Sequence, residues 1–128
     1  MRLTFNLFLF LLFTCFVAQA QTTNAKVDRV IVDTIYTTYY AKKFEGRKTT
    51  SGQKYRGAKF TAAHRTLPFG TMLLVKNLRT GKTVEVRVND RGPFSKKFSL
   101  DLSQAAAKTI GIYKLGYAKV EITYSLPQ

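Results

Sequence analysis

The chain has 128 residues, a length that fits a single domain. It carries 21 Lys and Arg residues against 7 Asp and Glu residues, which gives a formal net charge of +14 at pH 7. With one cysteine and one histidine, the composition excludes a metal site built from paired cysteines or histidines. The charge is compatible with an anionic partner such as nucleic acid, an anionic lipid or an acidic wall polymer, and equally with a repulsive surface that has no particular partner.

The first twenty residues have the layout of a secretory signal. Arg2 supplies the positive start, the run LFLFLLFTCFVA (residues 7–18) supplies an apolar core, and the closing AQA supplies small residues before a cleavage site. The core is shorter than the about 20 residues that span a bilayer, so we expect a cleaved signal rather than a membrane anchor. Cleavage after Ala20 leaves an exported chain that begins at Gln21. Lipid attachment at Cys15 is disfavoured because phenylalanine and threonine, rather than small residues, precede it.

After the signal, residues 21–32 show no strong element, and the pattern of a folded domain runs over residues 33–126. Strands are predicted where β-branched and aromatic residues gather or where apolar and polar residues alternate. One helix is predicted, with Ser103 as its N-cap and Gly111 at its end. Several short strands separated by turns indicate an all-β barrel rather than a parallel α/β sheet. The predicted strands are 34–40, 71–78, 83–90 and 119–126, and the predicted helix is 103–111.

The stretch RVNDRGPF contains a carboxylate in an unusual position. Val84, Val86 and Val88 alternate with polar residues, and continuing this alternation places Asp90 on the valine side of the strand. An inward carboxylate costs free energy unless it has a partner or opens onto a cleft. Two interpretations remain open: Asp90 caps the following Arg-Gly-Pro turn, or it does chemistry.

Other residues with chemical potential are few. His64 is the only histidine, and a lone histidine is more often a structural hydrogen-bonding group than a catalyst. The chain has neither the GxSxG spacing of a serine nucleophile nor a phosphate-binding glycine loop. Some aromatic residues could stack on sugars, and we expect two or three at most to line a groove while the others fill the core. These aromatic residues are Tyr39, Tyr40, Phe44, Tyr55, Phe60, Phe69 and Phe94.

Three blocks of the sequence resemble the RlpA-like lytic transglycosylases: YYAKKFEGRKTTSG, FTAAHRTLPFGTMLLVKNLRTGKTVEVRVNDRGPF and SLDLSQAAAKTIGI. The resemblance runs from about Thr38 to Ile122. It implies a six-stranded double-psi β-barrel with one or two short helices, the fold of expansins. It also implies an exported endolytic enzyme that cleaves MurNAc-GlcNAc glycan strands of peptidoglycan, preferably without stem peptides, and leaves 1,6-anhydromuramyl ends.

The resemblance also implies which residues act. It makes His64 of TAAH and Asp90 of NDRGP the catalytic residues. Two acidic positions in the family pattern, close to SGExFD, do not carry over, because Gln53 and Arg56 stand there; Ala41 likewise replaces a usual glycine. No metal or other cofactor is expected. The predicted substrate-binding residues are Arg91, Gln53, Tyr40, Tyr55, Thr61 and Asn89.

A single carboxylate in the motif region favours lytic transglycosylation over hydrolysis. A glycoside hydrolase normally uses two carboxylates. In a lytic transglycosylase the C6 hydroxyl of the sugar attacks its own anomeric carbon, so one residue can act first as acid and then as base. The acid needs a raised pKa, which burial supplies and a cation opposes. Arg91 and Arg56 would hold the pKa of Asp90 down if their side chains approached it.

Two alternative functions remain. A non-catalytic, expansin-like module would bind or loosen the wall without bond cleavage, and Gln53 and Arg56 favour it. A nucleic-acid binder fits the charge but conflicts with the export signal. We therefore expect a monomer in the periplasm or cell envelope whose partner is the peptidoglycan glycan strand. We expect no nucleic-acid partner and no membrane span after signal cleavage.

Overall fold

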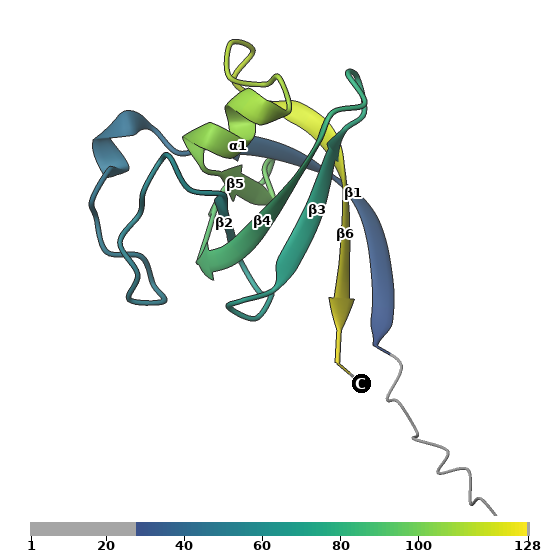
Figure 1. Cartoon of the computed structure of the whole chain (residues 1–128), viewed down its shortest axis with the longest axis horizontal. Helices are drawn as coiled ribbons and strands as arrows, with labels where there is room; N and C mark the ends of the chain where they lie inside the picture. The colour runs from purple at the N-terminus through teal and green to yellow at the C-terminus, as the bar shows by residue number, and fades with distance from the viewer. Residues whose placement is uncertain (1–27, 128) are drawn as a thin grey trace, which may run out of the picture.

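The computed structural model describes residues 28–127 and contains a closed six-stranded barrel (Figure 1). Its elements are β1 (Arg29–Tyr39), the 3-10 helix η1 (Lys42–Phe44), β2 (Thr61–His64), β3 (Met72–Asn77), β4 (Thr83–Asp90), β5 (Leu100–Leu102), α1 (Gln104–Thr109) and β6 (Ala118–Leu126). Around the barrel the strands follow the order β1-β5-β2-β4-β3-β6. The β1–β5 and β2–β4 pairs are parallel, and the other four pairs are antiparallel.

The strand pattern of the sequence is confirmed for β3, β4 and β6, but β1 is longer than predicted. β1 begins at Arg29 and so includes part of the segment 21–32, for which the sequence predicts no strong element. The added residues pair with β6, where Arg29 lies opposite Leu126. A partner strand, rather than the composition of the segment, therefore makes this part of the chain extended. β2 and β5 have four and three residues, which is too short for a pattern to indicate them.

The predicted signal segment, with Cys15 and the cleavage site after Ala20, lies outside the described residues. Within residues 28–127, no helix is long and apolar enough to cross a membrane.

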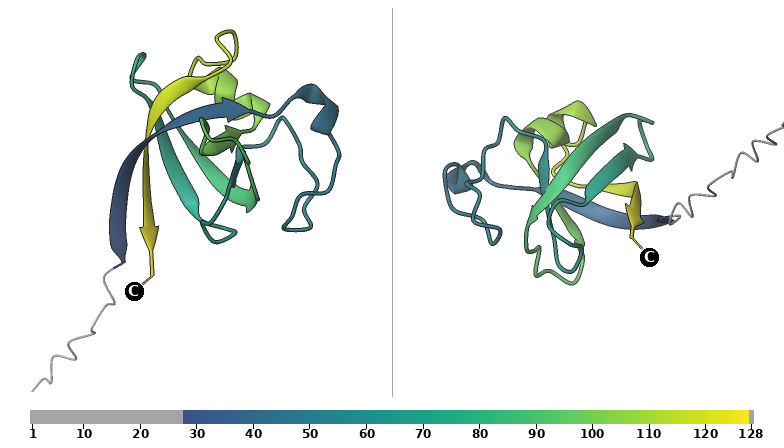
Figure 2. Two further views of the ribbon diagram at one scale, coloured as in Figure 1. Left: turned by 180° about the vertical axis from the view of Figure 1, so that it is seen from behind. Right: turned by 60° about the horizontal axis from the view of Figure 1, so that its bottom comes forward.

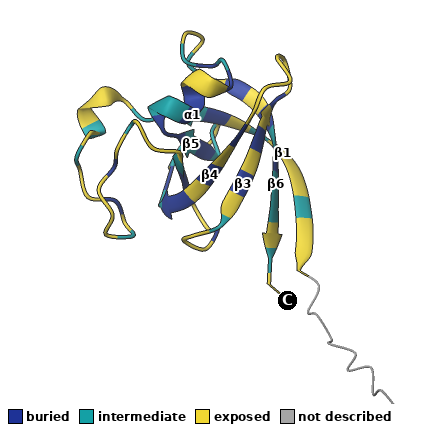
Figure 3. Ribbon diagram, viewed as in Figure 1, coloured by how far each residue is buried: buried dark blue, intermediate teal, exposed yellow. Residues whose placement is uncertain are grey.

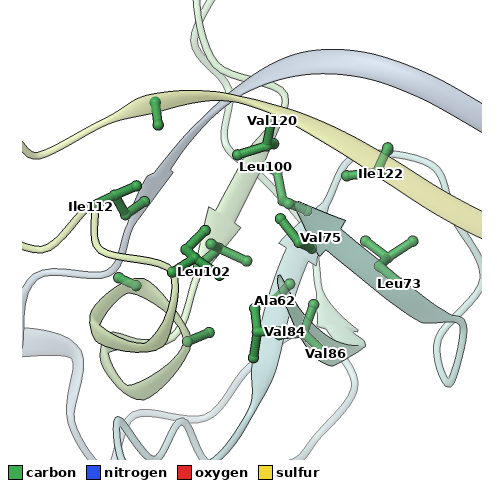
Figure 4. Close-up of a cluster of buried hydrophobic side chains, with 14 of the residues drawn as sticks. Ala62, Leu73, Val75, Val84, Val86, Leu100, Leu102, Ile112, Val120 and Ile122 are labelled. Carbon is green, nitrogen blue, oxygen red and sulfur yellow. The ribbon is translucent and has the colours of Figure 1, made fainter. Parts of the chain in front are cut away.

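The inner faces of the strands supply the hydrophobic core (Figures 3 and 4). Val84, Val86 and Val88 of β4 are buried in it, as their alternation predicts. The helix α1 adds Ala106 and Ala107, both fully buried, to the same cluster. Burial of apolar surface in this one cluster is the main stabilising contribution to the fold.

Both predicted ends of the helix are confirmed. The Ser103 side chain accepts a hydrogen bond from the backbone N–H of Ala106 (3.4 Å), as an N-cap residue does. Gly111 has φ of +78°, a conformation that glycine adopts without a steric penalty. The next residue, Ile112, donates its N–H to the carbonyl of Ala107 (3.0 Å). This bond satisfies one of the free carbonyls at the helix end.

A loop of residues 45–57 stands out from the side of the barrel (Figure 2). Its two arms are joined by a hydrogen bond from the Tyr55 N–H to the Arg47 carbonyl (2.7 Å). Its tip lies on the end of β4, where the Ser51 N–H donates to the Asn89 carbonyl (3.3 Å). The loop is thus held at its neck and at its tip, and it forms a wall on the outside of the barrel.

The cap of α1 gives a stability prediction. The Ser103 hydroxyl accepts the N–H groups of both Ala106 and Thr61, each at 3.4 Å, and Ser103 is fully buried. Ser103→Ala leaves both donors without this partner. We expect the free energy of unfolding to fall by about 1–2 kcal/mol, as measured by urea denaturation. Ser125→Ala, at an exposed position on β6, is the control and should change it by less than about 0.5 kcal/mol. Equal effects of the two substitutions would contradict the capping role.

Candidate active site

A cleft of about 730 Å³ opens between the 45–57 loop and the barrel, and we call it the aspartate cleft. Its walls come from the end of β1, the helix η1, the first arm of the loop, the segment that follows β4, and β5. More aromatic residues line it than the two or three predicted. These are Tyr39, Tyr40, Phe44, Tyr55 and Phe94.

A β-bulge at the end of β4 determines the direction of Asp90. Where β4 pairs with β2, Ala62 lies opposite Val88 and Ala63 lies opposite Asp90, so Asn89 is an extra residue. Ala62 belongs to the core cluster, and its neighbour Ala63 is on the other face of β2. Asp90 therefore lies on the outer face of the barrel. The predicted valine-side position is wrong, because the extra residue reverses the alternation.

Asp90 is held by three hydrogen-bond donors. Its Oδ1 accepts the backbone N–H groups of Thr50 (2.8 Å) and Arg91 (2.9 Å), and its Oδ2 accepts the hydroxyl of Tyr40 (2.5 Å). Partial burial alone would raise the pKa of Asp90, but these hydrogen bonds together bring it below its usual range. Asp90 thus both caps the turn and lies in the cleft as a fixed anion.

A second carboxylate, Asp101 of β5, lies in the same cleft. In β2, Ala63 lies opposite Asp101 of β5 on one side and opposite Asp90 of β4 on the other. Asp101 and Asp90 therefore share the outer face of the barrel, with the strand β2 between them. Burial, and then the negative charge of Asp90, raise the pKa of Asp101 to about 6. The two carboxylates therefore differ in their readiness to hold a proton, an arrangement that supports acid–base chemistry.

Asp101 corrects the prediction of a single carboxylate. The sequence carries a signal for it in SLDLS, where Leu100 and Leu102 alternate with Asp101 over a strand of three residues. Both leucines are fully buried, so the aspartate between them has to face outward. A strand this short is easily missed when no other element marks it.

Two tyrosines form the wall beside Asp90. Tyr40 stacks on Tyr55 with ring centres 4.3 Å apart. Burial, and then the hydrogen bond to Asp90, raise the pKa of Tyr40, so its hydroxyl remains a neutral donor. Tyr55 is only 2% exposed, and its hydroxyl accepts the N–H of Gln104 (3.2 Å). Tyr55 thus packs against the Tyr40 ring and offers little surface to a ligand.

The guanidinium group of Arg91 is turned away from Asp90. Its Nη1 donates to the carbonyls of His64 (3.2 Å) and Leu67 (2.8 Å), and the group lies 4.0 Å from the centre of the Phe69 ring. Arg91 thereby joins the end of β4 to the connection between β2 and β3. Its backbone N–H, rather than its guanidinium charge, helps to lower the pKa of Asp90.

His64 ends β2 and does not line the aspartate cleft. Its Nδ1 accepts the backbone N–H groups of Thr66 (3.2 Å) and Leu67 (3.1 Å). Burial, and then two nearby arginines, lower the pKa of His64, so its ring is neutral at pH 7 and Nδ1 is free to accept. His64 thus holds the turn after β2, and none of the hydrogen bonds to the Asp90 carboxylate comes from it.

The other predicted residues, Gln53, Thr61 and Asn89, lie together in a second cleft of about 480 Å³. Asn89 donates its side-chain N–H to the Gln53 side-chain oxygen (3.1 Å). This second cleft is lined by the other arm of the 45–57 loop, so the loop stands between it and the aspartate cleft. The predicted substrate-binding residues therefore divide between two places.

Arg56 also lines the second cleft and not the aspartate cleft. Its Nη1 lies 3.6 Å from Glu45 Oε1, and both side chains are about half exposed. Neither Arg56 nor the Arg91 guanidinium is among the causes of the pKa shift of Asp101, which are burial and the charge of Asp90. Among residues 28–127 there is no group of three or more His, Cys, Asp and Glu side chains that could hold a metal ion.

Comparison with known proteins identifies the family. The family model described as "Lytic transglycolase" matches residues 32–122 of the chain. The chain belongs to the lytic transglycolase family. Among similar proteins, the "Endolytic peptidoglycan transglycosylase RlpA" of Haemophilus influenzae is 55% identical over 84 residues, which is 66% of this chain and 29% of that protein.

A second relative and two solved structures extend the comparison. The "Probable endolytic peptidoglycan transglycosylase RlpA" of Treponema pallidum is 48% identical over 93 residues, which is 73% of this chain and 29% of that protein. The chain thus spans less than a third of either relative. The Clavibacter michiganensis expansin has a TM-score of 0.60 at 20% identity and matches 73% of this chain and 50% of its own. The Streptomyces papain inhibitor has a TM-score of 0.60 at 22% identity over 73% and 94% of the two chains.

These structures share the fold, and the predicted six-stranded double-psi β-barrel of the lytic transglycolase family is confirmed. The resemblance to the RlpA-like proteins is confirmed as well. Gln53 and Arg56, which depart from the usual family pattern, both lie in the second cleft. The departures therefore leave the two carboxylates of the aspartate cleft in place.

The coupling between the two carboxylates can be measured directly. Asp90→Asn removes the negative charge that helps to raise the pKa of Asp101, while burial still acts on it. We expect the pKa of Asp101 to fall below about 6 and to stay above the usual aspartate value of 3.8. Side-chain carboxyl NMR shifts recorded against pH give both values. The control is Asp33→Asn on the exposed part of β1, which should leave the Asp101 titration unchanged. If Asp90→Asn also left it unchanged, the two carboxylates would not be coupled.

Proposed function

We propose that this chain is an exported endolytic lytic transglycosylase that cleaves the glycan strands of peptidoglycan. The observation that carries the proposal is a pair of carboxylates with opposite pKa shifts in one aromatic-lined cleft. The names of the H. influenzae and T. pallidum relatives support peptidoglycan as the substrate. The signal layout of the first twenty residues supports an envelope location.

The first step is the breaking of the glycosidic bond. Asp101, with a pKa of about 6, donates its proton to the glycosidic oxygen. The bond between that oxygen and C1 of the muramyl unit breaks, and the leaving sugar departs with a free hydroxyl. Positive charge develops at C1 and the ring oxygen. Asp90 stays ionised because Thr50, Tyr40 and Arg91 donate to it, and its fixed charge stabilises this transition state.

The second step is closure of the sugar on itself. The C6 hydroxyl of the muramyl unit attacks C1, and its proton passes to the ionised Asp101, which is thereby restored. The product is a 1,6-anhydromuramyl end, and no water is consumed. The two steps together need one group that first donates a proton and then accepts one. Its raised pKa makes Asp101 better suited to this role than Asp90.

Other residues act by position or by contact. Tyr40 fixes Asp90, and Arg91 and His64 hold the connection between β2 and β3. Phe94 is 84% exposed and lines the cleft, so its ring is available to pack against a sugar. In this mechanism His64 acts indirectly. It holds the turn whose carbonyl groups accept the Arg91 guanidinium.

Single substitutions of the two carboxylates test this assignment. We expect Asp101→Asn and Asp90→Asn each to lower the release of anhydromuramyl products by at least about 100-fold, because each removes a charge or proton used in the transition state. Purified protein is incubated with peptidoglycan, either intact or stripped of stem peptides, and the soluble products are identified by mass spectrometry. Thermal unfolding of each variant serves as the folding control.

The outcomes of this assay separate the candidate functions. Full activity of Asp101→Asn would exclude it as the acid and return that role to Asp90. Binding to the glycan without any release by the wild-type protein would identify a wall-binding module, the alternative that Gln53 and Arg56 favour. Activity that falls in His64→Ala without a fall in thermal stability would give His64 a direct role in the chemistry.

The pH dependence of cleavage follows from the two pKa shifts. Since Asp101 must be protonated, the rate should decline as pH rises through about 6. Since Asp90 must be ionised, the rate should also decline at pH values below the usual aspartate range. Tyr40→Phe removes a hydrogen bond that lowers the pKa of Asp90, so it should move the acidic limb of the profile to higher pH and leave the other limb in place. A shift of the upper limb alone would contradict this assignment.

A further inference from the structure

The second cleft is lined by cations. Four basic side chains contribute to it, and no carboxylate does; they are Lys54, Arg56, Lys59 and Arg87. Only Arg56 has an ion pair within residues 28–127, the exposed contact with Glu45, and such a contact contributes little. A concave surface with four cations and no lining anion concentrates positive potential.

Backbone bonds bring these side chains together. The Lys59 N–H donates to the Arg56 carbonyl (3.0 Å), so one tight turn carries two of the cations. The Arg87 N–H donates to the Phe60 carbonyl (3.1 Å), which places a third cation beside the aromatic residue that follows this turn. The fold therefore fixes the backbone positions from which these side chains line the cleft.

The cleft also offers an apolar face and polar side chains. Phe60 lines it and is 49% exposed, a large exposure for an aromatic ring. Thr61 lines it as well, and its Oγ1 is buried with no hydrogen-bond partner among the described residues. Buried polar atoms without partners are uncommon in folded proteins. Asn89 is 5% exposed and, with Gln53, adds amide groups to the same lining.

We propose that the second cleft binds an acidic sugar unit of a glycan. The carboxylate or phosphate of the sugar is held by the guanidinium groups of Arg56 and Arg87, which bind such groups through paired N–H donors. The apolar C–H face of the sugar ring packs on Phe60. A cation cluster alone would serve any polyanion, whereas an aromatic ring in the same lining as two arginine side chains suits a sugar ring that carries one acid.

This binding requires neither carboxylate of the aspartate cleft. The 45–57 loop lies between the two clefts, and its arms contribute to both. The second cleft is therefore a glycan subsite that acts by retention, so its failure and the failure of the proposed cleavage activity can be told apart. The double variant Asp90→Asn and Asp101→Asn should lose cleavage and keep binding.

The test uses three sugars and the ¹⁵N-labelled protein. N-acetylmuramic acid offers a carboxylate, N-acetylglucosamine 6-phosphate offers a phosphate, and N-acetylglucosamine offers neither. In NMR titrations we expect at least one acidic sugar to shift the amide signals of Thr61, Arg87 and Asn89, and the neutral sugar to leave them unchanged. The tighter of the two acidic sugars identifies whether the natural ligand presents a carboxylate or a phosphate.

A charge-matched pair of double variants separates a site from general attraction. Arg56→Gln with Arg87→Gln should weaken binding of the acidic sugar by at least about tenfold, because each removes a charge-assisted hydrogen bond. Arg79→Gln with Lys82→Gln removes the same charge from exposed positions between β3 and β4. This control should change affinity by less than about twofold.

Two results would overturn the proposal. Equal weakening in the two double variants would mean that net charge alone attracts the sugar. Unchanged amide signals with both acidic sugars would mean that the second cleft holds no such unit. Since the four substituted side chains are exposed, folding of the variants is expected to be unaffected, and thermal unfolding verifies it.

Discussion

One inserted residue in β4 organises both clefts. Without the bulge at Asn89, alternation would direct Asp90 toward the core together with Val88. With the bulge, Asp90 faces the first arm of the 45–57 loop and Asn89 faces the second arm. The tip of the loop bonds to both residues, from Thr50 to the Asp90 side chain and from Ser51 to the Asn89 carbonyl. The loop is therefore anchored at the bulge, and a change in either would alter the two clefts together.

The chain has a net charge of +14, and a nearby cation would lower the pKa of a catalytic acid. Basic side chains of η1 and of the first arm of the loop do line the aspartate cleft, but no cation contributes to the pKa shift of Asp101. The Arg91 guanidinium is held on backbone carbonyls and on the Phe69 ring, while Arg56 belongs to the second cleft. Asp101 is left with burial and a neighbouring anion, both of which favour its protonated form. Asp90 has neutral donors instead of a cation, so it remains charged without cancelling the effect on Asp101.

The sequence predicted those features that depend on a pattern over many residues. The alternation in β4, the Ser103 cap and the Gly111 end all follow from local chemistry, and all are confirmed. The resemblance predicted the barrel. Asp101 was missed because its strand has three residues, and alternation needs a longer run to be visible.

The outward direction of Asp90 was missed for a different reason. A bulge is a property of two paired strands, and β2 has to be placed beside β4 before the extra residue can be seen. The direction of Arg91 also depends on a distant segment, since its acceptors are carbonyls after β2. Contacts between segments, rather than residue types, thus decide which predicted site residues meet.

The pairing of β1 with β6 has a mechanical consequence. Arg29 lies opposite Leu126 at one end of an antiparallel pair, so both ends of the described chain leave the barrel at the same place (Figures 1 and 2). Hydrogen bonds in such a pair run perpendicular to the strands. A tensile force applied between the two ends therefore acts along these hydrogen bonds and breaks them one after another, which is the unzipping geometry. It does not load all of the bonds at once, as a shear geometry would. Unfolding under force should therefore begin at low force, at the Arg29 end of β1. The two clefts lie toward the other end of β1 and beyond it, so they should be disrupted last.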